Sequence, residues 1–225
     1  MKIAIVGLGY VGLPLCLQFA RNDVDVIGLD IDASKVEHIN AGKSYIEHID
    51  GEAIRSAVAA GRLTASPDFV RVKEVEAIII CVPTPLNKNR EPDISYIIKT
   101  GEAIAGHLQK GTLVVLESTT YPGTTDTDLR EVLEKGSGLK AGTDFHLAFS
   151  PERVDPGNTV WNTRNTPKII GGVTPACTAR AQELYRHAVD TVVAVSGPRT
   201  AEMVKLLENT YRAINIGLAN ELAIM

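Results

Sequence analysis

The sequence predicts a doubly wound α/β fold, in which helices cover both faces of a parallel sheet, followed by one long helix. Short apolar, β-branched runs alternate with longer segments of helical periodicity from the N-terminus to about residue 197. The stretch from Pro198 to Met225 has instead the pattern of a single helix, with its proline where a first helical turn tolerates it. We therefore expect one domain over residues 1–197 and a connecting helix over residues 198–225.

Seven strands are predicted, at Lys2–Gly7, Val24–Asp30, Ala77–Val82, Thr112–Glu117, His146–Ser150, Lys168–Gly171 and Thr191–Ala194, with a weaker eighth near Leu63–Ala65. Helices are predicted between them, near Val11–Arg21, Ala33–Asn40, Gly51–Ala60, Ser95–His107, Thr125–Lys135 and Pro175–His187. Because strands covered on both faces form near-continuous apolar runs, we expect a parallel sheet.

The composition argues against several classes of function. A net charge of -4 and a pI near 5.8 provide no basic field to bind nucleic acid or an anionic membrane. Cys16, Cys81 and Cys177 do not have the spacing of metal ligands or of a disulfide framework, so we expect no metal site and a reducing cytoplasm. Glycines and a proline interrupt the apolar start of the chain, which argues against a signal peptide, and no other apolar run approaches the roughly 18 residues of a membrane span.

A glycine-rich segment, Gly7-Leu8-Gly9-Tyr10-Val11-Gly12, directly follows the first predicted strand and opens a helix. In that context the G-x-G-x-x-G spacing permits a tight turn and the close approach of a pyrophosphate. The phosphate charge then lies against backbone N–H groups at the positive end of the helix dipole. We therefore predict a Rossmann-type dinucleotide site that includes Gly7, Gly9, Tyr10, Val11 and Gly12.

Asp30 ends the next predicted strand, about twenty residues beyond the glycines. A carboxylate there accepts hydrogen bonds from the adenosine ribose hydroxyls and repels a 2′-phosphate, so we predict NAD and not NADP as the cofactor. Lys35, one turn into the following helix, is a further candidate for contact with the ribose or a phosphate. An exposed lysine without a role is the alternative.

Three loops follow strands at the edge where ligands bind in a doubly wound sheet. They are Cys81–Pro85, Glu117–Thr124 and Ser150–Gly157, and each combines hydroxyls or charges with prolines that fix the loop. We expect these loops to form a preorganised site. For Thr124 or Thr125 we favour a simple helix-capping role, but not for Thr119.

The final predicted helix carries Lys205 and Asn209, four residues apart and therefore on one face. A buried lysine needs a partner or an anionic substrate, and its ammonium can stabilise a developing alkoxide. A lysine that reaches solvent past an apolar stem is the alternative. The apolar residues of the helix fall nearly all the way round it, so we expect burial between two bodies of protein and a homodimer formed through it. The pattern ends at Met225 without a helix stop, so the chain is expected to be truncated.

Five stretches resemble the UDP-glucose/GDP-mannose dehydrogenase family in order and spacing, and together they cover essentially the whole chain. They are Gly7–Gly12, Val82–Pro85, Glu117–Thr124, Ser150–Gly157 and Glu202–Arg212. The resemblance implies oxidation of a sugar C6 alcohol to a carboxylate, with two NAD consumed, through an aldehyde and a cysteine-bound thioester. It also implies a UDP-sugar substrate and a place in polysaccharide biosynthesis.

The resemblance further implies roles for individual residues. Asp30 and Lys35 hold the adenosine ribose, while Thr84 and Thr119 line the nicotinamide side. Pro83 and Ser118 also contact the cofactor. Glu152 acts in acid/base chemistry or positions the hydrolytic water, Lys205 stabilises the oxyanion, Asn209 orients the C6 group, and Thr119 is shared between cofactor and water. Contacts with the substrate come from Glu152, Arg153, Val154, Lys205, Asn209 and Arg212.

Arg153 distinguishes branches of the family, because UDP-glucose enzymes usually carry an apolar residue after Pro-Glu. Pro-Glu-Arg-Val resembles the branch that oxidises UDP-N-acetylhexosamines, and we favour UDP-N-acetylglucosamine over its manno epimer. The family's nucleophilic cysteine lies in a Gly-Gly-His-Cys segment beyond the connecting helix, and none of the three cysteines here has that context. The resemblance therefore implies a chain without the catalytic cysteine or the UDP-binding domain, which binds NAD but does not turn over alone.

Two other hypotheses fit part of the sequence. β-Hydroxyacid dehydrogenases also join a Rossmann domain to a long helix with Lys-x-x-x-Asn and need no cysteine, but they have no reason to keep the Ser-Pro-Glu-Arg or Pro-Thr-Pro loops. The second hypothesis is a non-catalytic NAD-binding module, which would use the apolar last helix as its docking surface.

Overall fold

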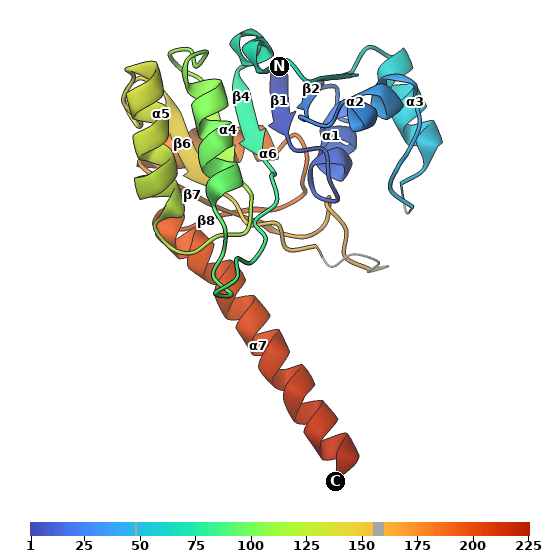
Figure 1. The fold of residues 1–225 in the computed structure, drawn as a ribbon, viewed down its shortest axis with the longest axis vertical. Coiled ribbons are helices and arrows are strands. Elements are labelled where there is room, and N and C mark those ends of the chain that lie inside the picture. Colours follow the sequence, from blue (N-terminus) through green and yellow to red (C-terminus); the bar gives the residue numbers. More distant parts are fainter. Residues whose placement is uncertain (48, 155–159) are drawn as a thin grey trace.

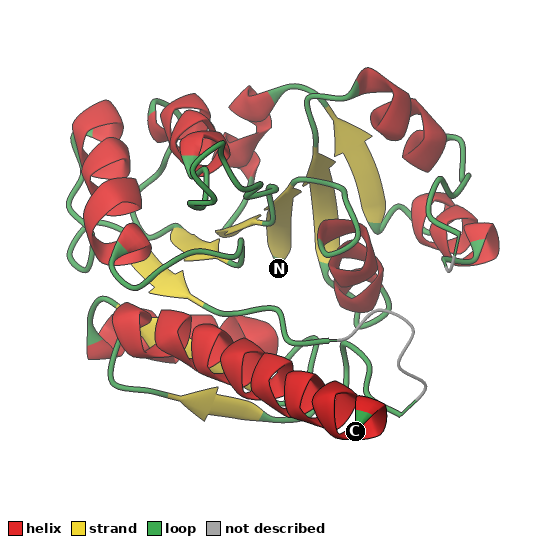
Figure 2. Cartoon of the chain, turned by 60° about the horizontal axis from the view of Figure 1, so that its bottom comes forward, coloured by secondary structure: helices red, strands yellow, loops and turns green. Residues whose placement is uncertain are grey.

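The strands form one sheet with helices on both faces, and a long helix leaves the body of the molecule (Figures 1 and 2). The structure is a computed structural model that describes residues 1–47, 49–154 and 160–225. The strand order among these residues is β3-β2-β1-β4-β5-β6-β7-β8. The predicted doubly wound architecture is therefore confirmed.

The strands are β1 Lys2–Val6, β2 Asp25–Leu29, β3 Leu63–Ser66, β4 Ala77–Ile80, β5 Leu113–Leu116, β6 His146–Phe149, β7 Lys168–Gly172 and β8 Val192–Ala194. The α-helices are α1 Gly12–Ala20, α2 Ala33–Asn40, α3 Gly51–Ala59, α4 Ser95–Ala105, α5 Arg130–Ser137, α6 Pro175–Tyr185 and α7 Pro198–Ile224. Two elements were not predicted as such: a 3₁₀ turn, η1 Phe69–Glu74, and a π-helical turn, η2 Thr124–Leu129, which precedes α5.

The expectation of a wholly parallel sheet is wrong at one pair of strands. Strands β1 to β6 pair in parallel, but β7 runs antiparallel to β6, with Ala148 opposite Gly172 and Phe149 opposite Gly171. A buried apolar run has the same residue pattern in either direction, so composition could not distinguish the two. As a consequence, β7 begins at the edge where β6 ends, and Lys168 lies there.

Alternate residues of each strand face two hydrophobic cores. Ile3 and Ile5 of β1 pack with α1, α2, α3 and α6 on one face, whereas Ala4 and Val6 pack with α4, α5 and the first turn of α7 on the other. This two-residue alternation is what a strand covered on both faces requires. The two layers hold the carboxyl ends of β1, β2, β4, β5 and β6 at one edge of the sheet.

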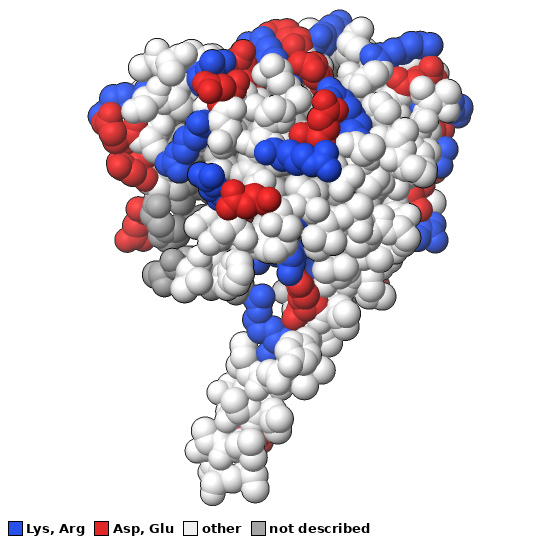
Figure 3. Space-filling view, turned by 180° about the vertical axis from the view of Figure 1, so that it is seen from behind, with Lys and Arg blue, Asp and Glu red and all other residues white. Residues whose placement is uncertain are grey.

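Helix α7 is buried only at its start. The prediction that the whole helix is buried is therefore not fulfilled by contacts within this chain. Pro198, Ala201 and Glu202 are buried, but every residue from Asn209 to Met225 is exposed. Figure 3 shows charged side chains of both signs scattered over the body, while the far half of α7 is mostly uncharged. No helix among the described residues is both long enough and apolar enough to cross a membrane.

Candidate active site

The glycine loop between β1 and α1 has room for a ligand at one glycine and none at the other two. A Cβ on Gly12 would lie 1.9 Å from the Gly7 oxygen, and one on Gly7, whose φ is +92°, would lie 2.7 Å from the Cys81 oxygen. A Cβ on Gly9 would meet no atom of the chain within 4 Å. Gly7 and Gly12 are therefore needed for the turn itself, while Gly9 faces open space that fits a close pyrophosphate.

Asp30 follows β2 and joins the glycine loop to the next helix. Its Oδ2 accepts hydrogen bonds from the Leu8 N–H at 2.8 Å and from Lys35 Nζ at 3.1 Å, and its Oδ1 accepts one from the Asp32 N–H at 3.0 Å. The carboxylate is thus fixed beside the loop, where an adenosine ribose lies in this fold. Lys35 pairs with Asp30 in this way, and its contact with the cofactor stays a prediction.

The nicotinamide-side residues occupy the loops after β4 and β5. Pro83 is exposed and Thr84 half-buried on the first loop. Ser118 is buried, and its hydroxyl donates to the Ile80 carbonyl at 3.4 Å, which ties the second loop to the end of β4. Thr119 is exposed and so remains available to a ligand.

Lys205 reaches from α7 to the loop after β5. Its Nζ donates to Thr119 Oγ1 at 2.7 Å, which brings together two predicted catalytic residues from distant parts of the sequence. Burial lowers the pKa of Lys205, and the Glu152 and Glu117 carboxylates oppose this shift. Such an ammonium can give up or share a proton more readily than an exposed lysine.

Glu202, which the sequence analysis did not select, anchors α7 one turn before Lys205. It is fully buried, and its carboxylate accepts hydrogen bonds from the Gly123 N–H at 2.7 Å, the Thr125 N–H at 2.9 Å and the Thr125 hydroxyl at 2.7 Å. Burial raises the pKa of Glu202, and these hydrogen bonds limit the rise. The carboxylate thereby caps the start of η2 from another helix, a role that no local pattern marks.

Replacing this anchor is expected to destabilise the fold. Glu202→Ala leaves two buried N–H groups without acceptors and should lower the free energy of unfolding by about 3 kcal/mol. The matched control is Arg199→Ala, on the same helix: its guanidinium pairs with Asp126 at 2.9 Å but is 63% exposed, so the loss should stay below about 1 kcal/mol. Urea denaturation measures both, and equal losses would contradict the assigned role of Glu202.

Glu152 follows β6 and is held on both of its oxygens. Its Oε1 accepts the N–H groups of Arg153 at 2.8 Å and Val154 at 2.6 Å, and its Oε2 lies 3.5 Å from Lys168 Nζ. Burial opposes ionisation, but Lys168 and these N–H groups outweigh it and lower the pKa of Glu152. Lys168 was not among the predicted site residues. Asp155, Pro156 and Gly157 of the same motif lie outside the described residues.

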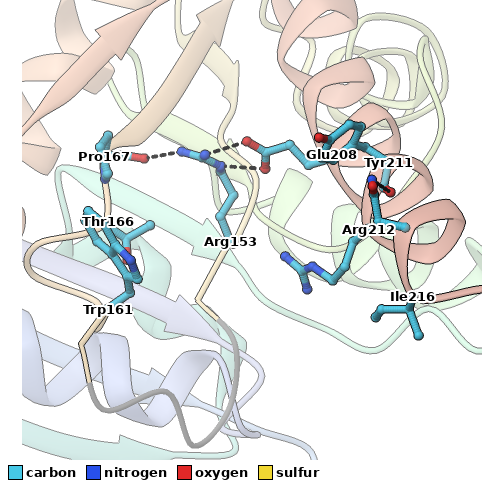
Figure 4. A pocket seen from close by; sticks show the side chains of 9 residues that line it. Arg153, Trp161, Thr166, Pro167, Glu208, Tyr211, Arg212 and Ile216 are labelled. Carbon is cyan, nitrogen blue, oxygen red and sulfur yellow. Dashed lines mark hydrogen bonds and ion pairs between the residues drawn. The ribbon is translucent and has the colours of Figure 1, made fainter. Parts of the chain in front are cut away.

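Arg153 connects this loop to α7. Its guanidinium binds both carboxylate oxygens of Glu208 and donates to the Pro167 carbonyl at 2.8 Å (Figure 4). Glu208 was also not predicted. Arg212 and Arg153 line one cavity of about 650 Å³ between α7 and the loop before β7. Asn209 is exposed on α7, one turn beyond Lys205.

Comparison with known proteins gives the family. The NAD-binding domain model of the UDP-glucose/GDP-mannose dehydrogenase family matches residues 1–189, and the central-domain model matches residues 199–225. UDP-N-acetyl-D-mannosamine dehydrogenase of Pyrococcus horikoshii is 40% identical over 100% of this chain and 54% of its own length. UDP-N-acetyl-D-glucosamine 6-dehydrogenase of Pseudomonas aeruginosa is 36% identical over 100% of this chain and 53% of its own.

Solved structures agree with this assignment. The UDP-D-ManNAc dehydrogenase of Pyrococcus horikoshii superposes with a TM-score of 0.93 at 39% identity, over 100% of this chain and 53% of that one. An NDP-N-acetyl-D-galactosaminuronic acid dehydrogenase from Methanosarcina mazei gives a TM-score of 0.90 at 37% identity, over 99% and 50%. The chain thus spans about half the length of the relatives it matches, and the β-hydroxyacid hypothesis is not supported.

The cofactor of this domain is NAD, and the glycine loop, Asp30 and the loops around Lys205 are its predicted site. The chain belongs to the UDP-glucose/GDP-mannose dehydrogenase family, and residues 1–189 match the NAD-binding domain of that family.

Proposed function

We propose that this chain supplies the NAD site and the proton-transfer groups of an enzyme that oxidises the C6 alcohol of a UDP-N-acetylhexosamine to a carboxylate. The contact of Lys205 with Thr119 carries the proposal, because it places a half-buried ammonium beside the predicted nicotinamide side. The relatives are named for mannosamine, glucosamine and galactosamine derivatives, and these names support a UDP-N-acetylhexosamine as the substrate. Our preference for the gluco epimer stays a prediction.

Each residue then has a chemical task. NAD, held by the glycine loop and Asp30, would supply the hydride acceptor for the substrate. Lys205 stabilises the negative charge that develops on the C6 oxygen, and Thr119 holds the ammonium in place. Glu152, kept ionised, serves as a base or positions water. Asn209 orients the C6 group, and Val154, Arg153 and Arg212 contact the substrate from the loop and α7.

The test is an assay of NADH formation. The 225-residue chain alone should bind NAD and form no NADH, since none of its cysteines has the nucleophile's sequence context. A hybrid that continues this chain after Met225 with the C-terminal half of the Pyrococcus horikoshii relative should form NADH with a UDP-N-acetylhexosamine and much less with UDP-glucose. Its Lys205→Ala variant, which still binds NAD, should lose activity by about a hundredfold or more.

Two results of this assay would count against the proposal. A folded hybrid that binds NAD but oxidises no UDP-sugar would favour a non-catalytic NAD-binding module. Steady NADH formation by the 225-residue chain alone would show that the reaction needs no cysteine from a further segment.

We also propose a homodimer formed through α7, in a cytoplasmic enzyme of polysaccharide biosynthesis. Leu207, Tyr211, Ile214 and Leu218 recur at the spacing of a coiled-coil seam and are 66%, 72%, 64% and 57% exposed. An apolar stripe of this length is costly to leave in water. The three free cysteines, two of them buried, agree with a reducing compartment.

Sedimentation equilibrium tests the dimer. The chain should sediment as a dimer, and Ile214→Glu with Leu218→Glu should convert it to a monomer because charges then face each other across the seam. Asn220→Glu, on the opposite face of α7, is the matched control and should remain dimeric. A clean monomer of the unmodified chain at high concentration would contradict the proposed interface.

A further inference from the structure

A buried ammonium lies directly behind the predicted acid/base residue. Lys168 is the first residue of β7, and its side chain is 7% exposed. Its Nζ lies 2.8 Å from Glu117 Oε2 and 3.5 Å from Glu152 Oε2, and 5.2 Å above the centre of the Tyr185 ring. The Tyr185 hydroxyl in turn donates to Glu117 Oε1. The cluster therefore joins the ends of β5 and β6 to α6.

The antiparallel register explains why Lys168 meets Glu152. Ala148 pairs with Gly172 and Phe149 with Gly171, so the same register, continued past the end of β6, sets Glu152 opposite Lys168. Glu117 follows β5, the parallel neighbour of β6 on its other side. A parallel β7 would have begun at the opposite edge of the sheet, far from both carboxylates.

The charged groups of this cluster interact more strongly with one another than charges on the surface do. Glu117 is fully buried and Glu152 is 15% exposed at its side chain, so neither carboxylate has full access to water. Burial opposes the charge on Lys168, but Glu117 and Glu152 outweigh it and raise the pKa of Lys168. The lysine is thus held as an ammonium, and its side chain is almost fully buried.

We propose that Lys168 is a positioning residue of the active site, which keeps the Glu152 carboxylate charged and fixed in place while Glu117 and Tyr185 hold Lys168. The proposal rests on the proposed function for what Glu152 does, but the electrostatic claim concerns only this chain. Glu152 is also faced by the charge of Lys205 on α7 and by the Cys81 thiol after β4. Of these groups, Lys168 is the cation in direct contact with it.

The test is the titration of Glu152 by NMR of the chain labelled with carboxyl-¹³C glutamate, with the signal assigned by its loss in Glu152→Gln. In the unmodified chain the pKa of Glu152 should lie below its ordinary value. In Lys168→Met it should rise by at least one unit, a tenfold change in the ionisation constant. Lys168→Arg, which keeps the charge, should restore it to within a few tenths of a unit.

A second variant covers the case in which Lys168→Met does not fold because Glu117 is left buried without a partner. Lys168→Met combined with Glu117→Gln removes both charges of the pair, which proteins tolerate better than a single buried charge. NAD affinity should stay unchanged in every folded variant. Because the Glu117 carboxylate also repels Glu152, the double variant is compared with Glu117→Gln alone. A Glu152 pKa that is no higher in the folded double variant than in Glu117→Gln, or an arginine that does not restore it, would overturn the proposal. Because the titration needs no substrate, it is independent of whether the sugar oxidation itself is confirmed.

Discussion

Gly9→Ala is expected to weaken NAD binding by about tenfold to a hundredfold, or roughly 1.4 to 2.8 kcal/mol, without destabilising the chain. A Cβ on Gly9 would meet no atom of the protein within 4 Å, so an alanine methyl has space in the free chain. It would occupy the space into which the pyrophosphate must come close. Calorimetry measures the affinity, and thermal unfolding measures the stability of the unliganded chain.

Gly12→Ala is the matched control on the same loop. Its Cβ would lie 1.9 Å from the Gly7 oxygen, so the loop or the start of α1 must move. This variant should lose several kcal/mol of stability together with its NAD binding. If Gly9→Ala binds NAD as tightly as the unmodified chain, the pyrophosphate does not lie at this loop as proposed.

Asp30→Asn is expected to reverse the preference between the two dinucleotides. Loss of charge-assisted hydrogen bonds to the ribose should lower the affinity for NAD by about tenfold or more. Lys35, now freed from its 3.1 Å contact with the carboxylate, can approach a 2′-phosphate that is no longer repelled, so NADP affinity should rise.

Lys35 provides the control for this change. Lys35→Met alone should alter NAD affinity by only about threefold, since the ion pair is partly exposed. Asp30→Asn combined with Lys35→Met should lose the gain in NADP affinity. Competitive titration measures all three variants. An Asp30→Asn chain that keeps the original preference for NAD would contradict the role of Asp30.

Much of the fold could be predicted because it depends on short-range pattern. Periods of two and of 3.6 residues locate strands and helices, and the glycine loop with Asp30 has a spacing imposed by the turn and by the ribose. The π-helical turn at Thr124–Leu129 and the antiparallel direction of β7 depend on packing between distant segments, which leaves no local signal. Both were missed for that reason.

The site likewise contains residues that a local pattern marks and residues that only the packing of distant segments brings into place. Thr119 and Lys205 were predicted separately, and the fold brings them within hydrogen-bond distance. Lys168, Glu202 and Glu208 were not predicted, because a single charged residue in a strand or helix is ordinary at a surface. A signal was present for Lys168, which begins a buried strand directly after a proline, where a lysine needs a carboxylate partner.

The most direct test of the NAD site is a calorimetric titration of NAD and NADP, separately, into the purified 225-residue chain. The geometry around Gly9 and Asp30 predicts that NAD binds at one site per chain and that NADP binds far more weakly. If NADP binds as tightly as NAD, or if neither binds to a folded chain, the assignment of this edge of the sheet as an NAD site is wrong.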